Sequence, residues 1–503
     1  MVYILIEDVA FEYVENWKFF LAAKLSESFE ISFLKINSTQ KMERVGLKKI
    51  IEDFQCLVES RGTNVSFDRN CIYSLWSLVA PPPKTEDIII NLTNIPAVDV
   101  RSYFKVARVW EILYHEKSLS SLTHIGECEM QNNSATIDIW LREVNKKTTI
   151  IVDVAKYNIH YSAVRNFMNV VYSLHFFLIK NLMKRRSEII ESDYYLVDVS
   201  MKYCLVAYLL SFYYTLSKKF IYKILNKITG IYNEKWTLAF GKGSGLVANP
   251  KDLICVNVPS TEFWADPFLI RNKGKYYVFF ERFPFKEKRG IISFGEFLPT
   301  EKKIINVSDV LSLPYHLSYP YLIEEDGNIY MIPECSENRC MEIYKAEKFP
   351  DEWRLYSSAF HGESIADTIY YKDENGDRWL FTTISDSEIN MHCTVLNIYR
   401  IDSLNLTKIE PHKQNPILVD CTCARNGGRI FIENGKKYRV AQNNSHGMYG
   451  YGISIREITK LSIDEYEEIE VRCVLGNEIL GGIGTHHLCQ IDDMFVMDVC
   501  IKQ

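Results

Sequence analysis

The pattern of apolar and polar positions changes along the chain, from helix-like and strand-like runs in alternation to strands alone. Val2–Ile6 and residues 87–92 (DIIINL) are predicted to be buried strands, the second of the kind found in parallel sheets. Ala10–Leu25 between them has helical spacing. Strands that alternate with helices are typical of an α/β domain. We predict one over residues 1–195.

Residues 196–234 are rich in Leu, Tyr and Phe and carry lysines at Lys218, Lys219 and Lys223. The apolar run before these lysines is about 13 residues long, short of the roughly 20 that cross a bilayer. Two interpretations remain open. The segment is either a helical linker packed between domains, or a helix lying on a membrane surface with its lysines toward lipid phosphates.

Residues 235–503 repeat one short unit five times, about every 50 to 60 residues. Each copy has an opening motif, an alternating strand, a polar turn and a second aromatic strand. The opening motifs are WADPF (264–268), SYPY (318–321), IADT (365–368), ARNGG (424–428) and GTHH (484–487). The period suits a four-stranded blade. The predicted fold class is therefore multidomain, an α/β domain followed by a five-bladed β-propeller.

The innermost strand of each blade delivers its first residues to the central channel, so the five opening motifs are expected to meet there. Glu281 and Glu334 close the second strands of their units and are further candidates for binding sugar hydroxyls. The candidate residues from the opening motifs are Asp266, Tyr319, Asp367, Arg425, Asn426, His486 and His487.

Structural roles compete with these functional ones. Asp266 precedes a proline and suits the start of a strand. Arg425 can pair with carboxylates and tie blades together, and the His486–His487 pair can cap the last strand. The adjacent Gly427 and Gly428 predict a bulge or a close approach of two backbones.

Charge and cysteine content narrow the class of partner. The formal net charge is -6 and the sequence pI about 6.1, so there is no global basic field for nucleic acid. The 13 cysteines include no C-x-x-C pair and no cluster at zinc spacing. They predict reduced thiols in a cytoplasmic protein, with no metal. The opening MVYILIED lacks a basic region, and we expect a strand there rather than a signal peptide.

Several spaced sequences resemble known families. FWADPFL, SYPYL, ADTIYY, ARNGGRIF, YRVAQN and YGYGISI resemble the propeller domain of the glucosamine inositolphosphorylceramide transferase family, over about half of the chain. The opening motifs are similar to those of family-43 glycoside hydrolases, which are five-bladed propellers. The layout of the first 180 or so residues resembles a formyltransferase-like Rossmann domain. Its Asn-x-His-Pro-Ser loop is absent, and His115 and His124 lack that context, so we expect this fold without that chemistry.

The hydrolase resemblance implies that Asp266 is the general base and that Asp367 orients and tunes the acid. The acid itself, a glutamate at the start of the fourth blade, is replaced by Arg425 and Asn426. Arginine stays protonated at physiological pH, so it cannot act as that acid. Its guanidinium instead binds a diphosphate through two parallel hydrogen bonds.

The function favoured by this replacement is a glycosyltransferase. It would use a nucleotide-sugar donor and a glycan or lipid-linked acceptor in surface polysaccharide or glycolipid synthesis, in the cytoplasm or at the inner face of the membrane. Asp266 or Asp367 would deprotonate the acceptor, Arg425 would hold negative charge, and the two histidines would line the pocket.

Two alternatives remain. One is a family-43-like glycoside hydrolase, for which Glu334 is the only nearby substitute acid. The other is a propeller that binds carbohydrate without catalysis, because the plant transferases that it resembles carry a separate catalytic domain.

Overall fold

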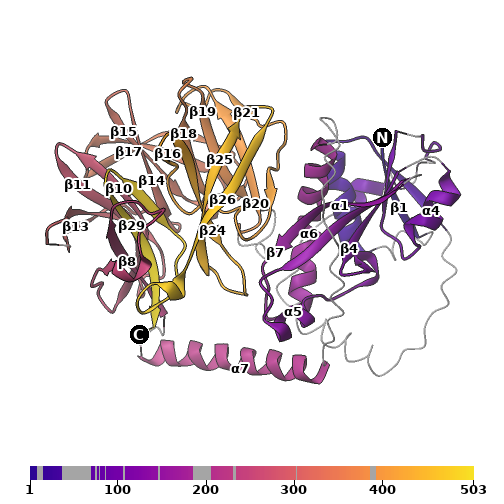
Figure 1. The fold of residues 1–503 in the computed structure, drawn as a ribbon, viewed down its shortest axis with the longest axis horizontal. Helices are drawn as coiled ribbons and strands as arrows, with labels where there is room; N and C mark the ends of the chain where they lie inside the picture. The colour runs from indigo at the N-terminus through magenta and orange to yellow at the C-terminus, as the bar shows by residue number, and fades with distance from the viewer. Residues whose placement is uncertain are drawn as a thin grey trace. The chain divides into compact units, whose positions relative to one another are not determined.

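The computed structural model describes residues 1–7, 15–36, 69–73, 76, 78, 80–84, 86–105, 108–145, 148–184, 205–229, 234–301, 303–385 and 392–502. The chain divides into two compact units (Figure 1). One is Met1–Phe212, and the other contains Tyr213–Asp386 and Met391–Gln503. The predicted boundary after residue 195 lies outside the described residues.

The N-terminal unit is built on a mixed sheet in the order β2-β1-β3-β4-β6-β7, with β5 paired to β4. Its first four strands run parallel, as near-continuous apolar runs predict, and β6 and β7 add antiparallel strands. The strands predicted at Val2–Ile6 and at residues 87–92 are confirmed as β1 and β3, and the alternating run at Ile31–Ile36 forms β2. The strands are β1 (Val2–Glu7), β2 (Ile31–Ile36), β3 (Ile88–Asn91), β4 (Arg108–Tyr114), β5 (Lys117–Ser118), β6 (Ile137–Val144) and β7 (Thr149–Tyr157).

Helices accompany this sheet. The predicted helix is present as α1, whose Trp17 packs edge-on against Phe167 of α6 at 6.3 Å between ring centroids. Residues 10–14 of the prediction lie outside the described part. His115 and His124 face buried glutamates, Glu129 at 3.0 Å and Glu127 at 3.1 Å. The helices are α1 (Asn16–Ser26), α4 (Ala97–Phe104), α5 (Glu127–Asn132) and α6 (Ala163–Lys184), with 3-10 turns η2 (Arg69–Ile72) and η3 (Leu119–Ser121).

Helix α7 (Leu205–Thr229) lies in the segment for which two interpretations were open. Near its start, Tyr208 and Phe212 are buried in a cluster with Ala163 of α6. The Tyr208 hydroxyl accepts a hydrogen bond from the Ala163 backbone N–H at 3.0 Å. Within the described residues, every helix is too short or too polar to cross a membrane.

The C-terminal unit is a five-bladed β-propeller, which confirms the prediction from the repeats (Figure 1). The first strand and the second strand of each predicted unit pair as neighbours in one blade. Blade 1 has β10 (Glu262–Asn272), β11 (Lys275–Pro284), β12 (Ile291–Leu298) and β13 (Lys303–Leu311). Blade 2 has β14 (Ser318–Glu325), β15 (Asn328–Glu334), β16 (Met341–Lys348) and β17 (Glu352–Ala359).

The remaining blades follow the same plan with shorter additional strands. Blade 3 has β18 (Ile365–Lys372), β19 (Arg378–Ile384), β20 (Val395–Ile401), β21 (Ile409–Pro411) and β22 (Leu418–Val419). Blade 4 has β23 (Phe431–Glu433), β24 (Lys436–Asn443), β25 (Gly452–Leu461) and β26 (Tyr466–Leu475). Blade 5 has β27 (Gly482–Gly484), β28 (Leu488–Ile491), β29 (Met494–Lys502), β8 (Glu234–Lys242) and β9 (Ile254–Cys255).

Both ends of the propeller sequence meet in blade 5. Strand β8, the first of the propeller, pairs antiparallel with β29, the last, from Glu234 opposite Lys502 to Lys242 opposite Met494. This pairing closes the ring of blades with main-chain hydrogen bonds.

Local sequence explains the hairpins that begin the blades. In blades 1, 2 and 4, the turn between the first two strands has two residues with positive φ, the second of them glycine. These turns are Lys273–Gly274, Asp326–Gly327 and Asn434–Gly435. Such turns match the twist of paired strands and need residues that tolerate positive φ.

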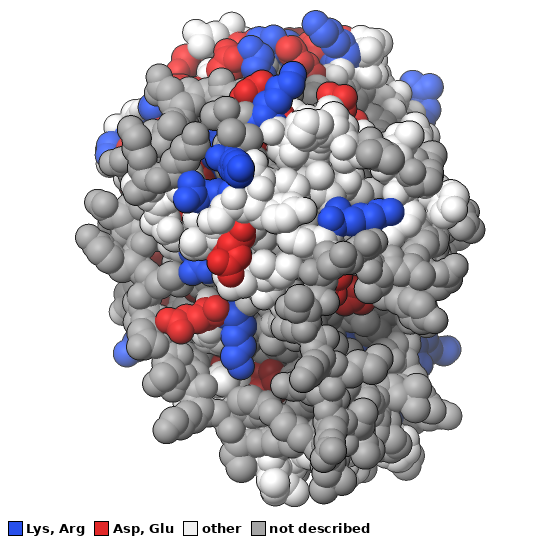
Figure 2. Space-filling model, turned by 90° about the vertical axis from the view of Figure 1, so that its right-hand side faces the viewer, with Lys and Arg blue, Asp and Glu red and all other residues white. Residues whose placement is uncertain are grey.

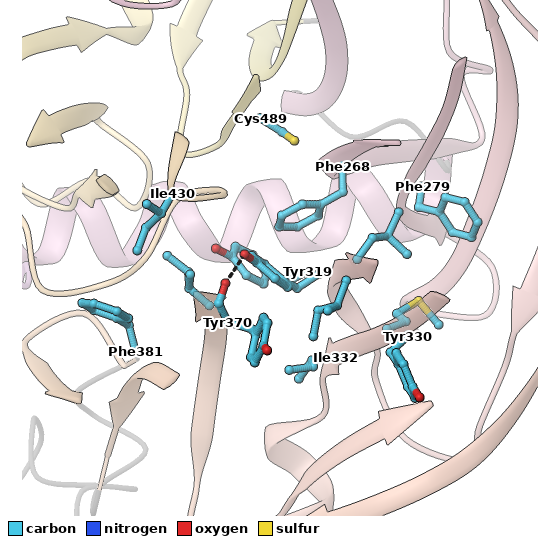
Figure 3. Packing of buried hydrophobic residues seen from close by; sticks show 14 of the residues in the cluster. Phe268, Phe279, Tyr319, Tyr330, Ile332, Tyr370, Phe381, Ile430 and Cys489 are labelled. Atoms are coloured by element: carbon cyan, nitrogen blue, oxygen red, sulfur yellow. Dashed lines mark hydrogen bonds between the residues drawn. The ribbon is translucent and has the colours of Figure 1, made fainter. Parts of the chain in front are cut away.

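Apolar side chains from all five blades pack into one core. Figure 3 shows Phe268 of blade 1, Tyr319 of blade 2, Phe381 of blade 3, Ile430 before β23 of blade 4 and Cys489 of blade 5 around a common centre. All five are buried. At the level of these residues the axis is filled by packed side chains and is not an open pore.

Candidate functional site in the propeller axis

The same backbone distortion occurs where three of the inner strands reach the axis. In β10 the pairing register shifts between Ala265 and Phe268, and β14 and β18 shift at the equivalent place. The residues at these bulges are Asp266, Tyr319 and Asp367, with φ of 51°, 46° and 48°. Non-glycine residues avoid this region, at a cost of about 1–3 kcal/mol, and bulges redirect side chains. The bulges turn these three side chains out of the regular alternation.

Asp367 and Arg425 form a buried ion pair between blades 3 and 4. Asp367 Oδ2 accepts hydrogen bonds from Arg425 Nε at 2.6 Å and from Gln442 Nε2 at 2.8 Å. The Asp367 side chain is 1% exposed and that of Arg425 is 11% exposed. Burial raises the pKa of Asp367 to about 7, against the opposing charge of Arg425. Asp367 Oδ1 has no hydrogen-bond partner among the described residues, so this oxygen is left for a ligand or a proton.

Asp266 and Asp498 flank His486. Its Nε2 lies 3.1 Å from Asp266 Oδ1, and its Nδ1 lies 3.1 Å from Asp498 Oδ2. Burial would raise the pKa of Asp266, but His486, the next histidine and Arg425 outweigh burial and lower it to about 2. Burial would lower the pKa of His486, but the two aspartates raise it. Asp266 is therefore ionised, and the two aspartates favour the protonated form of His486.

Asp498 also holds the backbone of this site. Its Oδ1 accepts hydrogen bonds from the backbone N–H groups of His486 at 2.9 Å and His487 at 3.0 Å. Its Oδ2 accepts one from the Asp266 N–H at 3.2 Å. The sequence prediction missed Asp498, although a signal was present. It is the one charged residue in the apolar run MFVMDVC, and a buried charge requires partners.

His487 lies in the packed floor of the axis. It is fully buried, and burial lowers its pKa to about 3, so the ring is neutral. Its ring packs edge-on against Phe268 at 4.5 Å and Tyr319 at 5.3 Å between centroids. Its Nδ1 lies 3.6 Å from Asp266 Oδ1.

Tyr319 and Asn426 connect blades, a role that the prediction of substrate contacts did not include. The Tyr319 hydroxyl accepts a hydrogen bond from the Gly428 N–H at 3.0 Å and donates one to the Gly428 carbonyl at 3.1 Å. Asn426 Nδ2 donates to the carbonyls of Asp367 at 2.7 Å and Phe381 at 3.0 Å. Both amide hydrogens of Asn426 are therefore used within the protein.

The predicted close backbone approach at Gly427 and Gly428 is confirmed. A Cβ on Gly427 would lie 2.6 Å from the carbonyl oxygen of His486. A Cβ on Gly428, which has φ of 150°, would lie 1.8 Å from that of Leu488. Only glycine allows blade 4 to pack this closely on blade 5.

Glu281 and Glu334 have opposite protonation tendencies. Burial, with the charges of Asp266 and Glu334, raises the pKa of Glu281 well above its usual value. Burial would raise the pKa of Glu334 too, but His316 and hydrogen bonds from Ser336 outweigh it and lower the value. Glu334 accepts from Ser318 Oγ at 2.9 Å and Ser336 N–H at 2.7 Å. The surroundings thus favour the protonated form of Glu281 and the ionised form of Glu334, a division typical of acid–base sites.

Aromatic rings lie beside Arg425 and His486. The guanidinium lies over the Tyr449 ring at 5.3 Å from its centroid. The Tyr449 and Trp236 rings lie 5.1 Å and 4.3 Å from the His486 ring. These contacts join the Asp367–Arg425 pair to the Asp266–His486 pair. Neither Tyr449 nor Trp236 was among the predicted site residues, because both lie outside the opening motifs, although Tyr449 begins the sequence YGYGISI that carries part of the family resemblance.

The sequence predicted no metal, yet three of these residues have the geometry for one. Asp266, His486 and Asp498 each offer a ligand atom, and these atoms lie within 4.8 Å of one another. In this structure both ring nitrogens of His486 face carboxylates, which an ion pair explains equally well.

Comparison with known proteins relates the propeller to one family. Residues 241–489 match the family described as glucosamine inositolphosphorylceramide transferase 1, N-terminal. The chain is 32% identical over 256 residues to the protein of that name from Oryza sativa subsp. indica and 30% identical over 256 residues to that from Arabidopsis thaliana. These matches cover 48% and 49% of this chain but 33% of each relative. The chain thus spans about a third of the length of these relatives.

Two solved structures are similar to part of the chain. A thermostable family-43 glycoside hydrolase covers 48% of this chain and 90% of its own, with 12% identity and a TM-score of 0.37. The RS223 β-xylosidase covers 47% and 92%, with 10% identity and a TM-score of 0.35.

Proposed function

We propose that the propeller binds a nucleotide-sugar donor at its axis and transfers the sugar to a glycan or lipid-linked acceptor, in glycolipid or surface polysaccharide synthesis. The observation that carries this proposal is Arg425, a partly exposed guanidinium paired with Asp367 among buried carboxylates. Carboxylates suit sugar hydroxyls, which donate hydrogen bonds, and a guanidinium suits a diphosphate. The relatives that resemble this propeller carry the name of a transferase.

In the proposed reaction, Asp266 or Asp367 accepts the proton of the acceptor hydroxyl. The oxygen of that hydroxyl bonds to the anomeric carbon of the donor sugar. The bond from that carbon to the diphosphate oxygen breaks, and its electron pair leaves with the nucleoside diphosphate. Arg425 stabilises this charge. A pKa of about 7 makes Asp367 the better base at neutral pH. Asp266, whose pKa is lowered to about 2, stays ionised and orients sugar hydroxyls.

The first test is ligand-induced thermal stabilisation of the purified chain. We expect nucleoside diphosphates and nucleotide sugars to raise the melting temperature and Arg425→Ala to abolish the effect. The matched control is Arg354→Ala, whose side chain is 72% exposed and which should respond like the wild type. Equal stabilisation of the wild type and Arg425→Ala by a nucleoside diphosphate would contradict the assignment.

A specific observation also supports a glycoside hydrolase. Burial raises the pKa of Glu281, and the charge of the nearby ionised Asp266 raises it further, so the two carboxyls suit the roles of acid and base. This makes Glu281 a better substitute acid than Glu334, whose pKa is lowered. Release of reducing sugar from aryl glycosides, lost in Glu281→Gln, would favour hydrolysis over transfer.

A propeller that only binds carbohydrate is the third function. The match to the relatives covers only one third of their length. Their catalytic part can therefore lie outside the region that resembles this propeller, which supports a binding role. Stabilisation by oligosaccharides alone, without turnover of any donor, would favour it. For the N-terminal unit we propose a formyltransferase-like shell without formyl transfer, because His115 and His124 are paired with glutamates.

A further inference from the structure

Helix α7 exposes one continuous apolar stripe. Seven of the ten large apolar side chains that α7 exposes share it, each 42% to 69% exposed: Val206, Leu210, Tyr213, Tyr214, Phe220, Ile221 and Ile224. The other three, Leu216, Tyr222 and Leu225, lie beside it or on the opposite side of the helix. At about 100° per residue these positions fall within roughly a third of the helix circumference. Over the 25 residues of α7 the helix is about 37 Å long. This is a large apolar surface for a helix to expose.

The stripe is not the face that packs on Ala163 of α6. The buried Tyr208 and Phe212 lie two positions before and after Leu210, which turns them about 160° away from it. The packing face at the start of α7 is therefore used, and the apolar stripe is left for a second partner.

Charge identifies the class of that partner. Helix α7 contains four lysines and no Asp or Glu. Lys218 and Lys223 flank the two edges of the stripe, and with Lys219 they are exposed. On the face of the molecule shown in Figure 2, by contrast, basic and acidic side chains of described residues are interspersed. Positive charge alone, beside an apolar and aromatic stripe, is complementary to a partner surface that is both anionic and apolar.

We infer that α7 binds the surface of a bilayer that contains anionic lipids, lying parallel to it with the stripe among the acyl chains. Tyr214 and Phe220 would sit at the level of the headgroups, where aromatic side chains favour the interface. The lysines would extend along the helix to the lipid phosphates. This surface does not depend on the reaction in the propeller, and it would bring the chain to a lipid-linked molecule.

The experiment is flotation of the full chain with two kinds of vesicle. One is phosphatidylcholine alone, and the other also contains about 30% phosphatidylglycerol, which makes its surface strongly anionic. We expect at least tenfold more protein on the anionic vesicles. The double variant Phe220→Asp/Ile224→Asp should lose at least tenfold of this binding. Lys218→Glu/Lys219→Glu/Lys223→Glu should bind both vesicle types equally weakly. The matched control is Leu355→Asp on the propeller, where Leu355 is 50% exposed, and it should float like the wild type.

Two results would overturn the inference. The first is equal flotation of the wild type and the stripe variant. The second has two parts: the wild type does not float with vesicles, and light scattering shows that the wild type is a dimer whereas the stripe variant is a monomer. The stripe would then be a contact between two copies of the chain. The stripe variants should keep the melting temperature of the wild type without nucleotide. An unchanged melting temperature shows that they fold, and because it does not depend on nucleotide binding it separates failure here from failure of the proposed function.

Discussion

At the scale of single residues, the axis is a set of neighbouring carboxyls held in different protonation states. Asp266 and Asp498 face the same imidazole, yet the pKa of Asp266 is lowered to about 2 while burial raises that of Asp498 to about 6. The difference arises because Asp266 also receives the fields of Arg425 and His487. Such a division lets one site hold bases and acids at one pH.

Asp498→Asn tests whether this residue organises the site. The amide keeps the shape but leaves His486 with one carboxylate, so the pKa of His486 should fall. Removing one partner of a buried ion pair costs about 3–5 kcal/mol, and we expect a loss of about 3 kcal/mol in the free energy of unfolding. Urea unfolding and NMR titration of His486 measure the two effects. Asp492→Asn, on an exposed turn of the same blade, should change stability by less than about 0.5 kcal/mol.

Glu281 and Glu334 predict opposite responses to pH. The pKa of Glu281 is raised on folding, so the folded state keeps a proton that the unfolded chain releases above about pH 4.3. This lowers stability as pH rises. Glu281→Gln removes that loss, and its stability relative to the wild type should increase from pH 5 to pH 8.

Glu334→Gln supplies the comparison. The pKa of Glu334 is lowered on folding, so its contribution is complete above the unfolded pKa and is lost only as pH falls through the folded value. The variant should lose about 1–3 kcal/mol, equally at pH 5 and pH 8. Urea unfolding measures the stability of each of the two variants relative to the wild type at pH 5 and at pH 8. A pH-independent difference for Glu281→Gln would show that its carboxyl is ionised.

At the scale of elements, the sequence predicts strands well and their partners poorly. The five units were visible because each opening motif and its second strand are adjacent in the sequence and share an alternating pattern and a polar turn. The pairing of β8 with β29 joins residues 234–242 to 494–502, and no local pattern encodes a contact across that separation. Tyr319 and Asn426 show the same limit. Only the folded structure reveals that the Tyr319 hydroxyl is hydrogen-bonded to Gly428 and that the Asn426 side-chain oxygen is hydrogen-bonded to Arg439.

Gly428→Ala tests the contact between blades 4 and 5. The added Cβ would lie 1.8 Å from the Leu488 carbonyl oxygen, and it would displace the backbone groups that bind Tyr319. We expect a loss of more than about 3 kcal/mol in the free energy of unfolding, because buried backbone has no room to move. Gly435→Ala also has positive φ but nothing within 4 Å, and should cost about 1 kcal/mol. Equal effects of the two substitutions, measured by urea unfolding, would contradict this packing.

At the scale of the whole molecule, two compact units with separate cores are joined through α7. The sequence anticipated an α/β part and a propeller, because the period of the apolar pattern differs between them. It could not assign the nucleotide to either part. Phosphates can bind a basic residue in a propeller axis or the carboxyl ends of parallel strands, and both are present here.

Calorimetry of the full chain decides between these two places. Two compact units should unfold in two transitions, and Gly428→Ala identifies the propeller transition by lowering it. A nucleoside diphosphate at about 100 times its dissociation constant adds about 2.7 kcal/mol to whichever unit binds it. If Arg425 holds the diphosphate, only the propeller transition should rise, and it should stay unchanged in Arg425→Ala. A rise in the other transition would place the phosphates in the N-terminal unit and leave the propeller axis to the sugar alone.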